Sequence, residues 1–382
     1  MRILTVSSCP LDPMLGSGKT RLRWSEGLRG LGHEVDVMEP GDFELWHGAR
    51  RAIRFRQAVG AISAVLSRIR RQRYDLVEFF GGEFGLVTRR LAQLRERPFI
   101  VAHTDGFELL ASERERAYLP LRGPIDHLRW WLREHAHDRL SAAAFEHADA
   151  FVTGCELDRK RATEMGMFSM DRAAVIAPGI DAEYLAVTPR KNREPRIAFT
   201  GSWIPRKGIG LLVRVMNEVL SVRPHVQLDL YGTRHPPGVI LDGFAPEVRK
   251  RITVFGRLTN AQIAERLSSA AVFLFPSQYE GFGMALAEAM ACGCAPVTTP
   301  TGFGGELIDG REAIVCAFDD ESRVRTAVLA LLDDAGLRAR IAGAARIRVE
   351  GLSWDTQIAN LDRTYRSWLT GGATCDRSDS PV

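Results

Sequence analysis

Two glutamates with seven residues between them surround a glycine-rich turn in the second half of the chain. The segment 275–296 has the pattern of a buried strand, a turn and a helix that begins near Gly283. Gly281 and Gly283 remove side chains from the turn, so backbone N–H groups and the positive end of the helix dipole can approach an anion. Glu280 precedes the helix and Glu288 lies about one turn into it.

Carboxylates beside a bound diphosphate do not help to bind it. They are suited to accept hydrogen bonds from hydroxyl groups, because an ionised carboxylate is purely an acceptor. The segment therefore predicts a site for a nucleotide-diphosphate sugar. One glutamate would hold the transferred hexose and the other the ribose.

A second glycine-rich stretch, Leu15-Gly-Ser-Gly-Lys-Thr20, follows the first apolar run. It resembles the end of a P-loop, which requires a glycine five positions before Gly18, where this chain has Pro13. Proline lacks the N–H and the φ freedom that a phosphate cradle needs at that position. We therefore favour a strand-to-helix turn whose helix N-terminus faces a ligand cleft and lets a ligand approach the backbone.

Short apolar runs alternate with helical patterns along the chain. Many of these runs are continuous, which is typical of parallel strands covered on both faces. The alternation predicts a doubly wound α/β architecture. The expected strands are Arg2–Ser7, His33–Met38, Tyr74–Phe80, Pro98–His103, Ala150–Gly154, Ala174–Ala177, Arg196–Gly201, Val226–Tyr231, Ile252–Phe255, Ala271–Phe275, Ala295–Thr298 and Ala313–Cys316.

The chain divides near its middle. We predict a first Rossmann-like domain over residues 1–187, a linker over 188–195 with two prolines and no apolar periodicity, and a second Rossmann-like domain over 196–352. Apolar residues recur at helical spacing in 353–370, so we expect a C-terminal helix that packs back on the first domain. The Gly-, Ser- and Asp-rich tail 371–382 is expected to be disordered.

The composition excludes several classes of protein. A length of 382 residues suits two domains, and 45% hydrophobic with 26% charged residues is typical of a soluble globular protein. A net charge of +4 is too small to indicate nucleic-acid binding without a clustered patch. The six cysteines lack zinc-site spacing, and Cys292 and Cys294 read as small buried thiols in a reducing compartment. The N-terminus reads as a strand rather than a signal peptide, so we expect a cytoplasmic enzyme.

The segment around Glu280 and Glu288 resembles the Glu-x7-Glu signature of the retaining GT-B glycosyltransferases, family four in particular. This resemblance covers nearly the whole chain and implies two facing Rossmann-like domains with a cleft between them. It also implies that the first domain binds an acceptor and the second a nucleotide-sugar donor. Further segments that resemble family motifs are Phe199–Gly208, Val254–Arg257, Thr301–Glu306, Gly32–Val35 and Pro178–Asp181.

The resemblance implies a role for each matching residue. Lys207 and Arg206 would neutralise the donor diphosphate and stabilise it as a leaving group. Glu288 would accept hydrogen bonds from the ribose, and Glu280 would hold the hexose. The backbone that would support the hexose beside Glu280 belongs to Gly281, Phe282, Gly283 and Met284.

Other matches concern the rim of the expected cleft. His103 matches a histidine whose ring or backbone faces the donor sugar, and Gly16 matches a glycine-rich turn opposite the phosphates. Arg257 completes the donor-binding set. Ser202 is a departure, because many members carry an arginine there, so either Arg206 supplies that charge or the donor is held more loosely. Asp105 reads as the cap of the helix that follows it.

The resemblance implies transfer with retention of configuration and without a metal or other cofactor. The sequence has no Asp-x-Asp triplet, the usual carboxylate pair for a metal-bound diphosphate. A front-face displacement is the working hypothesis for the mechanism. The alternatives are a nucleotide-sugar epimerase or sugar phosphorylase of the same fold, or a non-catalytic nucleotide-sugar-binding protein. A glycogen-type phosphorylase would need a pyridoxal-bound lysine, and the second domain has only Lys207 and Lys250.

An arginine-rich stretch suggests where the enzyme works. Between Trp46 and Arg73 lie eight arginines and no acidic residue, with apolar residues at helical spacing. This is either an ordinary surface helix with solvated cations or a helix that rests on an anionic membrane, where each cation contributes roughly 1 kcal/mol. The second interpretation predicts a peripheral enzyme on the inner face of the membrane, with a lipid-linked or saccharide acceptor. The arginines assigned to the membrane are Arg50, Arg54, Arg68 and Arg71, and the apolar residues are Ala52, Phe55, Val59, Ile62, Leu66 and Ile69.

Overall fold

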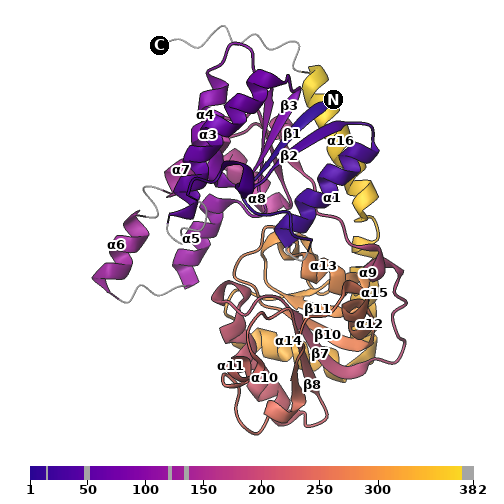
Figure 1. Ribbon diagram of the computed structural model, residues 1–382. Coiled ribbons are helices and arrows are strands. Elements are labelled where there is room, and N and C mark those ends of the chain that lie inside the picture. Colours follow the sequence, from indigo (N-terminus) through magenta and orange to yellow (C-terminus); the bar gives the residue numbers. More distant parts are fainter. Residues whose placement is uncertain (14–15, 47–51, 119–122, 133–136, 372–382) are drawn as a thin grey trace.

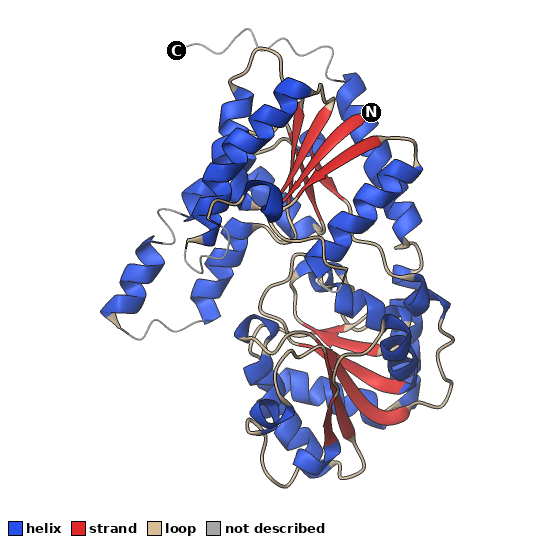
Figure 2. Cartoon of the chain, viewed as in Figure 1, coloured by secondary structure: helices blue, strands red, loops and turns tan. Residues whose placement is uncertain are grey.

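The computed structural model describes residues 1–13, 16–46, 52–118, 123–132 and 137–371. Two parallel β-sheets, each with six strands, lie one above the other with helices on both faces of each (Figures 1 and 2). This confirms the predicted doubly wound α/β architecture. The strands are β1 (Arg2–Ser7), β2 (Glu34–Met38), β3 (Leu76–Phe80), β4 (Phe99–His103), β5 (Ala150–Thr153), β6 (Ala173–Val175), β7 (Glu194–Thr200), β8 (Gln227–Tyr231), β9 (Ile252–Val254), β10 (Ala270–Phe275), β11 (Ala295–Thr298) and β12 (Ile314–Val315).

The helices alternate with these strands through both halves. Those of the first half are α1 (Gly16–Gly30), α2 (Pro40–Phe43), α3 (Ile53–Arg71), α4 (Gly85–Ala92), α5 (Glu108–Tyr118), α6 (Pro124–Leu132), α7 (Arg139–Glu146), α8 (Glu156–Glu164) and α9 (Ala182–Ala186). Those of the second half are α10 (Ile209–Val222), α11 (Pro237–Leu241), α12 (Asn260–Ser269), α13 (Met284–Ala291), α14 (Glu321–Asp333), α15 (Ala335–Val349) and α16 (Trp354–Gly371).

Each strand begins and ends within two residues of its predicted bounds. The main difference is β7, which begins at Glu194, inside the stretch 188–195 that we predicted as a linker. The Arg193 guanidinium donates to the carbonyl oxygens of Leu267 and Ala270 at 3.2 and 2.8 Å. These bonds tie the end of the linker to the start of β10, so Glu194 pairs with Ala270 and extends the strand.

The order of the strands determines where a ligand can bind. The first sheet has the order β2-β1-β3-β4-β5-β6, which reverses between β1 and β3, and the second has β12-β11-β10-β7-β8-β9, which reverses between β7 and β10. In open parallel sheets, ligands bind beyond the carboxyl ends of the strands at such a reversal. The segments after β7 and β10 therefore form the expected binding position of the second half.

The chain passes between the halves at two adjacent places. On the first passage, the backbone N–H of Ile180 donates to the carbonyl of Leu352 at 2.7 Å, and Ile180 forms a parallel bridge with Ser353. The second passage leads into α16, which returns to the first half and lies along α1 (Figure 1). There its apolar face packs into the core of the first sheet. The buried residues of α16 in that core are Trp354, Ile358, Leu361, Tyr365 and Trp368.

Tyr365 joins α16 to a buried polar network beneath the first sheet. Its hydroxyl donates to the carboxylate of Glu78 and lies 2.6 Å from Nε2 of His103, which is 3.3 Å from the same carboxylate. The Thr5 hydroxyl also donates to Glu78. Although burial alone would raise the pKa of Glu78, its partners His103, Thr5 and Tyr365 hold that pKa below its usual value. The carboxylate is therefore charged and fully buried.

Helix α3 contains the arginine-rich stretch, and its packed face matches the predicted one in part, because Ile62, Leu66 and Ile69 pack against the core. The residues buried on the first sheet include Ala58, Ala61 and Val65, whereas Phe55, which we expected on that face, is 61% exposed. The cause is Gly60, where an added Cβ would stand 1.8 Å from the carbonyl oxygen of Phe43. This close approach sets the rotation of the helix. Within the described ranges, no helix is long and apolar enough to cross a membrane.

The substitution Tyr365→Phe should destabilise the protein by about 1–3 kcal/mol, because it removes one hydrogen-bond donor from a buried carboxylate. Urea unfolding followed by tryptophan fluorescence measures the change. Ser367→Ala removes one oxygen from the exposed face of the same helix and is the matched control. Equal midpoints for Tyr365→Phe and the control would contradict the role given to the hydroxyl.

Candidate functional site

A cleft of about 1620 Å³ lies between the carboxyl ends of the two sheets and is lined by both halves of the chain. Its wall in the second half includes the segments that follow β7 and β10, where the order of the strands reverses, together with the segments that follow β8 and β9. The structure brings most of the residues predicted from the sequence to this cleft. Those that line it are Gly16, Ser202, Arg206, Lys207, Arg257, Glu280, Gly281, Phe282, Gly283, Met284 and Glu288.

Lys207 and Glu280 form an ion pair at the centre of this wall. Nζ of Lys207 donates to both carboxylate oxygens of Glu280, at 2.7 and 2.9 Å, and both side chains are largely buried. Lys207 ends a short 3₁₀ turn (Pro205–Lys207) after β7, and the following Gly208 has a φ of 68°. A Cβ on Gly208 would stand 1.8 Å from the carbonyl oxygen of Pro276, so glycine lets the two loops meet. The pair thus joins the two strands at the point of reversal.

The turn after Glu280 approaches the first half of the chain. An added Cβ on Gly281 would stand 1.8 Å from the carbonyl oxygen of Asp105. Beside it, the Tyr279 hydroxyl donates to the carboxylate of Asp158 at 3.1 Å, across the two halves. Burial raises the pKa of Asp158 to about 7. Glycine at position 281 therefore allows the two walls of the cleft to touch, and Tyr279 holds Glu280 in place.

Helix α13 places Glu288 deeper in the cleft. Gly283, with a φ of 101°, precedes the helix, and the first residues of the helix, Met284 and Ala285, line the cleft. Glu288 lies 3.5 Å from Nζ of Lys19, which belongs to α1 in the first half. Burial raises the pKa of Glu288, and Lys19 opposes that shift. Sequence reasoning treated Lys19 only as part of a failed P-loop signature and did not anticipate this contact.

His103 does not line the cleft with the other predicted residues. It ends β4, and its ring is 1% exposed beneath the first sheet, between Glu78, Tyr365 and Phe80. Nδ1 of the ring is buried and has no hydrogen-bond partner among the described residues. The following Thr104 and Asp105 reach the cleft instead. The structure therefore keeps the ring of His103 within the protein core, whereas the resemblance allowed either the ring or the backbone to face the donor sugar.

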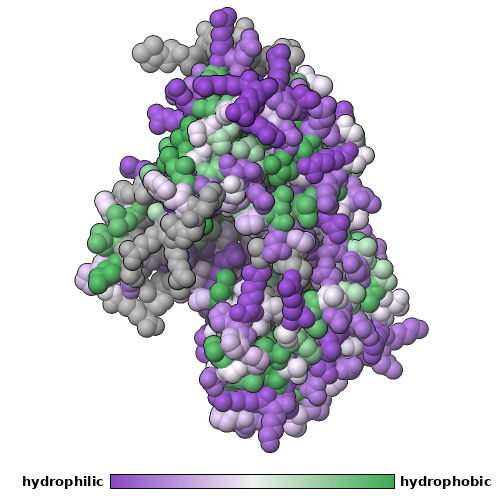
Figure 3. All heavy atoms as spheres, in the orientation of Figure 1, coloured by the Kyte–Doolittle hydropathy of each residue, from purple (hydrophilic) through white to green (hydrophobic). Residues whose placement is uncertain are grey.

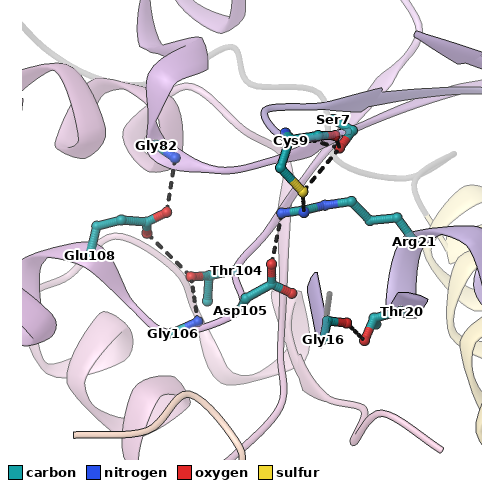
Figure 4. Close-up of polar contacts among 10 residues, drawn as sticks. All are labelled: Ser7, Cys9, Gly16, Thr20, Arg21, Gly82, Thr104, Asp105, Gly106 and Glu108. Atoms are coloured by element: carbon teal, nitrogen blue, oxygen red, sulfur yellow. Dashed lines mark hydrogen bonds and ion pairs between the residues drawn. The ribbon is translucent and has the colours of Figure 1, made fainter. Parts of the chain in front are cut away.

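We had expected Asp105 to cap the next helix, but it does not. The hydroxyl of Thr104 accepts the N–H of Gly106 at 3.0 Å, and the Asp105 carboxylate accepts from the guanidinium of Arg21 at 2.7 Å instead (Figure 4). Arg21 is 4% exposed and also contacts the thiol of Cys9. The sequence carried one signal of this contact, the charged run that follows the glycine-rich turn and contains Arg21. If that arginine is buried, it needs a carboxylate partner.

Glu108 supports the loops at the same edge of the first sheet. Its carboxylate accepts from the N–H of Gly82 at 2.9 Å and from the Thr104 hydroxyl at 3.2 Å (Figure 4). Burial, together with the nearby charge of Glu83, raises the pKa of Glu108 to about 8. These bonds connect the loops after β3 and β4, and they fix the wall that carries Asp105.

Two families match the sequence, one in each half. The family described as Glycosyltransferase Family 4 matches residues 16–184, and the family described as Glycosyl transferases group 1 matches residues 194–334. The two matches meet near the linker and together include every predicted site residue.

Curated relatives align with about half of their own length. A GDP-mannose-dependent monoacylated alpha-(1-6)-phosphatidylinositol monomannoside mannosyltransferase of Corynebacterium glutamicum is 29% identical over 181 residues, which are 45% of this chain and 47% of that protein. The phosphatidyl-myo-inositol mannosyltransferase of Mycobacterium tuberculosis is 28% identical over 227 residues, which are 56% of this chain and 59% of that protein. Among solved structures, sucrose-phosphate synthase (tll1590) from Thermosynechococcus elongatus is 19% identical and has a TM-score of 0.76, with 97% of this chain and 100% of that chain covered. This likeness confirms the GT-B fold.

The substitution Gly281→Ala should separate the two walls of the cleft, because the new methyl group would meet the backbone of Asp105. We expect a loss of stability of about 1–3 kcal/mol, as for other overpacked sites. Calorimetric melting measures it. Gly256→Ala, at a glycine that lines the same cleft with open space at its Cβ position, is the control. Melting temperatures that are the same for both variants would contradict the close contact at Gly281.

Proposed function

Since this chain belongs to family 4 of the glycosyltransferases (group 1), we propose that it moves a hexosyl group from a nucleotide-diphosphate sugar to a saccharide or lipid-linked acceptor. The anomeric configuration would be retained, and the product would belong to a cell-surface polysaccharide or glycolipid. The observation that carries the proposal is the Lys207–Glu280 pair at the strand-order reversal, beside the glycine turn at the start of α13.

The arrangement supplies the electrostatic work that this reaction needs. The bond between the anomeric carbon and the diphosphate oxygen breaks, and a bond from the same carbon to the acceptor oxygen forms on the same face. The hydroxyl proton of the acceptor passes to the departing phosphate oxygen. Negative charge therefore grows on the diphosphate, where Lys207, Arg206 and the first N–H groups of α13 stabilise it.

Glu280 binds the hexose once the donor enters. In the structure, both oxygens of its carboxylate accept from Lys207. The diphosphate competes for the ammonium group, because phosphate oxygens are also strong acceptors of charge-assisted hydrogen bonds. Glu280 is then available to accept from sugar hydroxyls. Glu288, about one turn into α13, takes the ribose hydroxyls.

We further propose that the first half rests on an anionic membrane during transfer to a lipid-linked acceptor. Arg54, Arg68 and Arg71 of α3 are exposed, while Arg50 lies outside the described residues. Apolar side chains are also exposed on the projecting helix α6 of the first half, whose surface is green in Figure 3. The relatives named for phosphatidylinositol substrates support an acceptor of this kind. The exposed apolar residues of α6 are Ile125, Leu128, Trp131 and Leu132.

The substitution Glu280→Ala should lower turnover strongly and leave the affinity for the nucleoside diphosphate unchanged or higher, because Lys207 loses its competing partner. Lys207→Ala should weaken that affinity by about tenfold or more, since a charge-assisted bond contributes roughly 1.5–3 kcal/mol. Calorimetric titration and donor turnover measure the two effects. Glu265→Ala, an exposed carboxylate of α12, is the control. Full turnover in Glu280→Ala would refute the assignment of the hexose.

Wild-type protein should sediment with vesicles of phosphatidylglycerol and do so less as salt rises, because exposed cations are screened. Reversal of Arg50, Arg54, Arg68 and Arg71 to Glu should reduce this binding. The control is the reversal of Lys250, Arg311 and Arg340 to Glu. It changes the charge in the same direction, but in the second half of the chain instead of on α3. The membrane proposal is overturned if wild-type protein stays in solution at low salt.

A further inference from the structure

Asp181 lies where the chain first passes between the halves, and its side chain is 2% exposed. Its Oδ1 accepts from the indole N–H of Trp354 at 2.8 Å, at the start of α16. Its Oδ2 accepts from the amide of Asn260 in α12 at 2.7 Å and from Nζ of Lys19 in α1 at 2.8 Å. One buried carboxylate thus connects both passages of the chain with a helix from each half.

Lys19 is the member of this group that also enters the cleft. It stands in the first turn of α1, where the Thr20 hydroxyl donates to the carbonyl of Gly16 at 2.9 Å (Figure 4). The Lys19 side chain is 13% exposed, and its Nζ lies between Asp181 and Glu288, at 2.8 and 3.5 Å. An ammonium group from the first half therefore touches a carboxylate that belongs to the second half.

The charges around Lys19 make it a strong constraint on Glu288. Burial alone would lower the pKa of Lys19, but Glu288 and Asp181 raise it above its usual value, so the side chain stays an ammonium. Besides Lys19, the groups that face Glu288 are the carboxylate of Asp181, the hydroxyl of Tyr184 and the thiol of Cys292. None of these three groups can offset the negative charge of Glu288. Among the groups that face it, the ammonium group of Lys19 compensates that charge.

We propose that Lys19 is a positioning residue for nucleotide binding, which holds the carboxylate of Glu288 ionised and aimed at the ribose and links that site to the passage between the halves at Asp181. The proposal rests on the proposed function, because it takes Glu288 as the ribose ligand. The glycine-rich turn that fails as a phosphate cradle thereby has a different use. Its lysine acts on the nucleotide through Glu288.

This arrangement couples the nucleotide to the geometry of the cleft. Nζ of Lys19 contacts both Glu288 and Asp181. A ribose that draws Glu288 toward itself therefore changes the interaction between Lys19 and Asp181. Asp181 in turn holds Trp354 at the return passage. Binding of the ribose and the relative position of the halves therefore both depend on the ammonium group of Lys19.

The test is a double-mutant cycle on the full chain, with calorimetric affinity for a nucleoside diphosphate as the readout. GDP, UDP and ADP are compared by thermal shift first, and the one that stabilises wild-type protein most is titrated. We expect Lys19→Met to weaken this affinity about tenfold in the wild-type background and less than about twofold in the Glu288→Gln background. Equal losses in the two backgrounds would overturn the proposal, because Lys19 would then act independently of Glu288.

A pH series separates positioning from simple support of the fold. Without Lys19, the pKa of Glu288 rises further, and the carboxylate needed by the ribose is lost at a higher pH. The affinity of Lys19→Met should therefore fall earlier than that of wild-type protein as pH decreases, and should recover as pH rises. The nucleotide's own phosphate titrates equally in both proteins, so the difference between them reports Glu288. Parallel pH profiles would contradict the proposal.

Two more variants control for damage to the passage between the halves at Asp181. Arg23→Met removes another cation of α1 that reaches Asp181, at 3.8 Å, but does not touch Glu288, so its effect should be additive with Glu288→Gln. Lys19→Arg keeps the charge and should restore most of the affinity; no recovery in a stable Lys19→Arg protein would count against positioning by charge. If Glu288→Gln alone leaves the affinity unchanged, the ribose assignment in the proposed function fails. If it weakens binding while Lys19→Met does not, only the role of Lys19 fails.

Discussion

The cleft depends on how the chain is held where it passes twice between the halves. Ile180 and Leu352 are joined by a backbone hydrogen bond, and the buried carboxylate of Asp181 accepts donors from α1, α12 and α16. A buried carboxylate without partners would be very unfavourable, so these bonds also fix the segments that supply them. Helix α16 then continues into the core of the first sheet, which anchors the return passage. The carboxyl ends of both sheets face one another as a result.

Much of this architecture follows from local patterns in the sequence. Each strand of a covered parallel sheet is a short continuous apolar run, so all the strands could be placed within two residues of their true bounds. The residues proposed to bind the donor could be found in the same way, because Gly281, Gly283 and Glu288 lie within one strand–turn–helix segment. The reversal of strand order beside that segment is a property of the parallel sheet itself. Where chemistry and local structure share one stretch of chain, the sequence is a sufficient guide.

The sequence did not reveal contacts between residues that are distant along the chain. Lys19 and Asp181 are 162 positions apart, and Arg21 and Asp105 are 84 apart, so no spacing rule could join them. His103 ends a strand next to the cleft, but Tyr365 arrives from α16 and holds its ring in the core. The exposure of Phe55 on α3 was missed for a related reason. It depends on contact between Gly60 and a carbonyl from another segment, and helical periodicity carries no information about that contact.

Three carboxylates that line the cleft are each paired with a cation. Lys207 holds Glu280, Lys19 holds Glu288, and Arg21 holds Asp105. Because a buried carboxylate without a cation is so unfavourable, Lys207 and Lys19 stabilise the largely buried Glu280 and Glu288. In the third pair the buried partner is the guanidinium of Arg21, and Asp105 is partly exposed. Under the proposed function, a donor would replace one set of these bonds with another, and its affinity would be the difference in free energy between the two sets. Two of these pairs, Lys19 with Glu288 and Arg21 with Asp105, take their cation from α1. This helix is therefore the part of the first half whose position most directly sets the charge balance of the cleft.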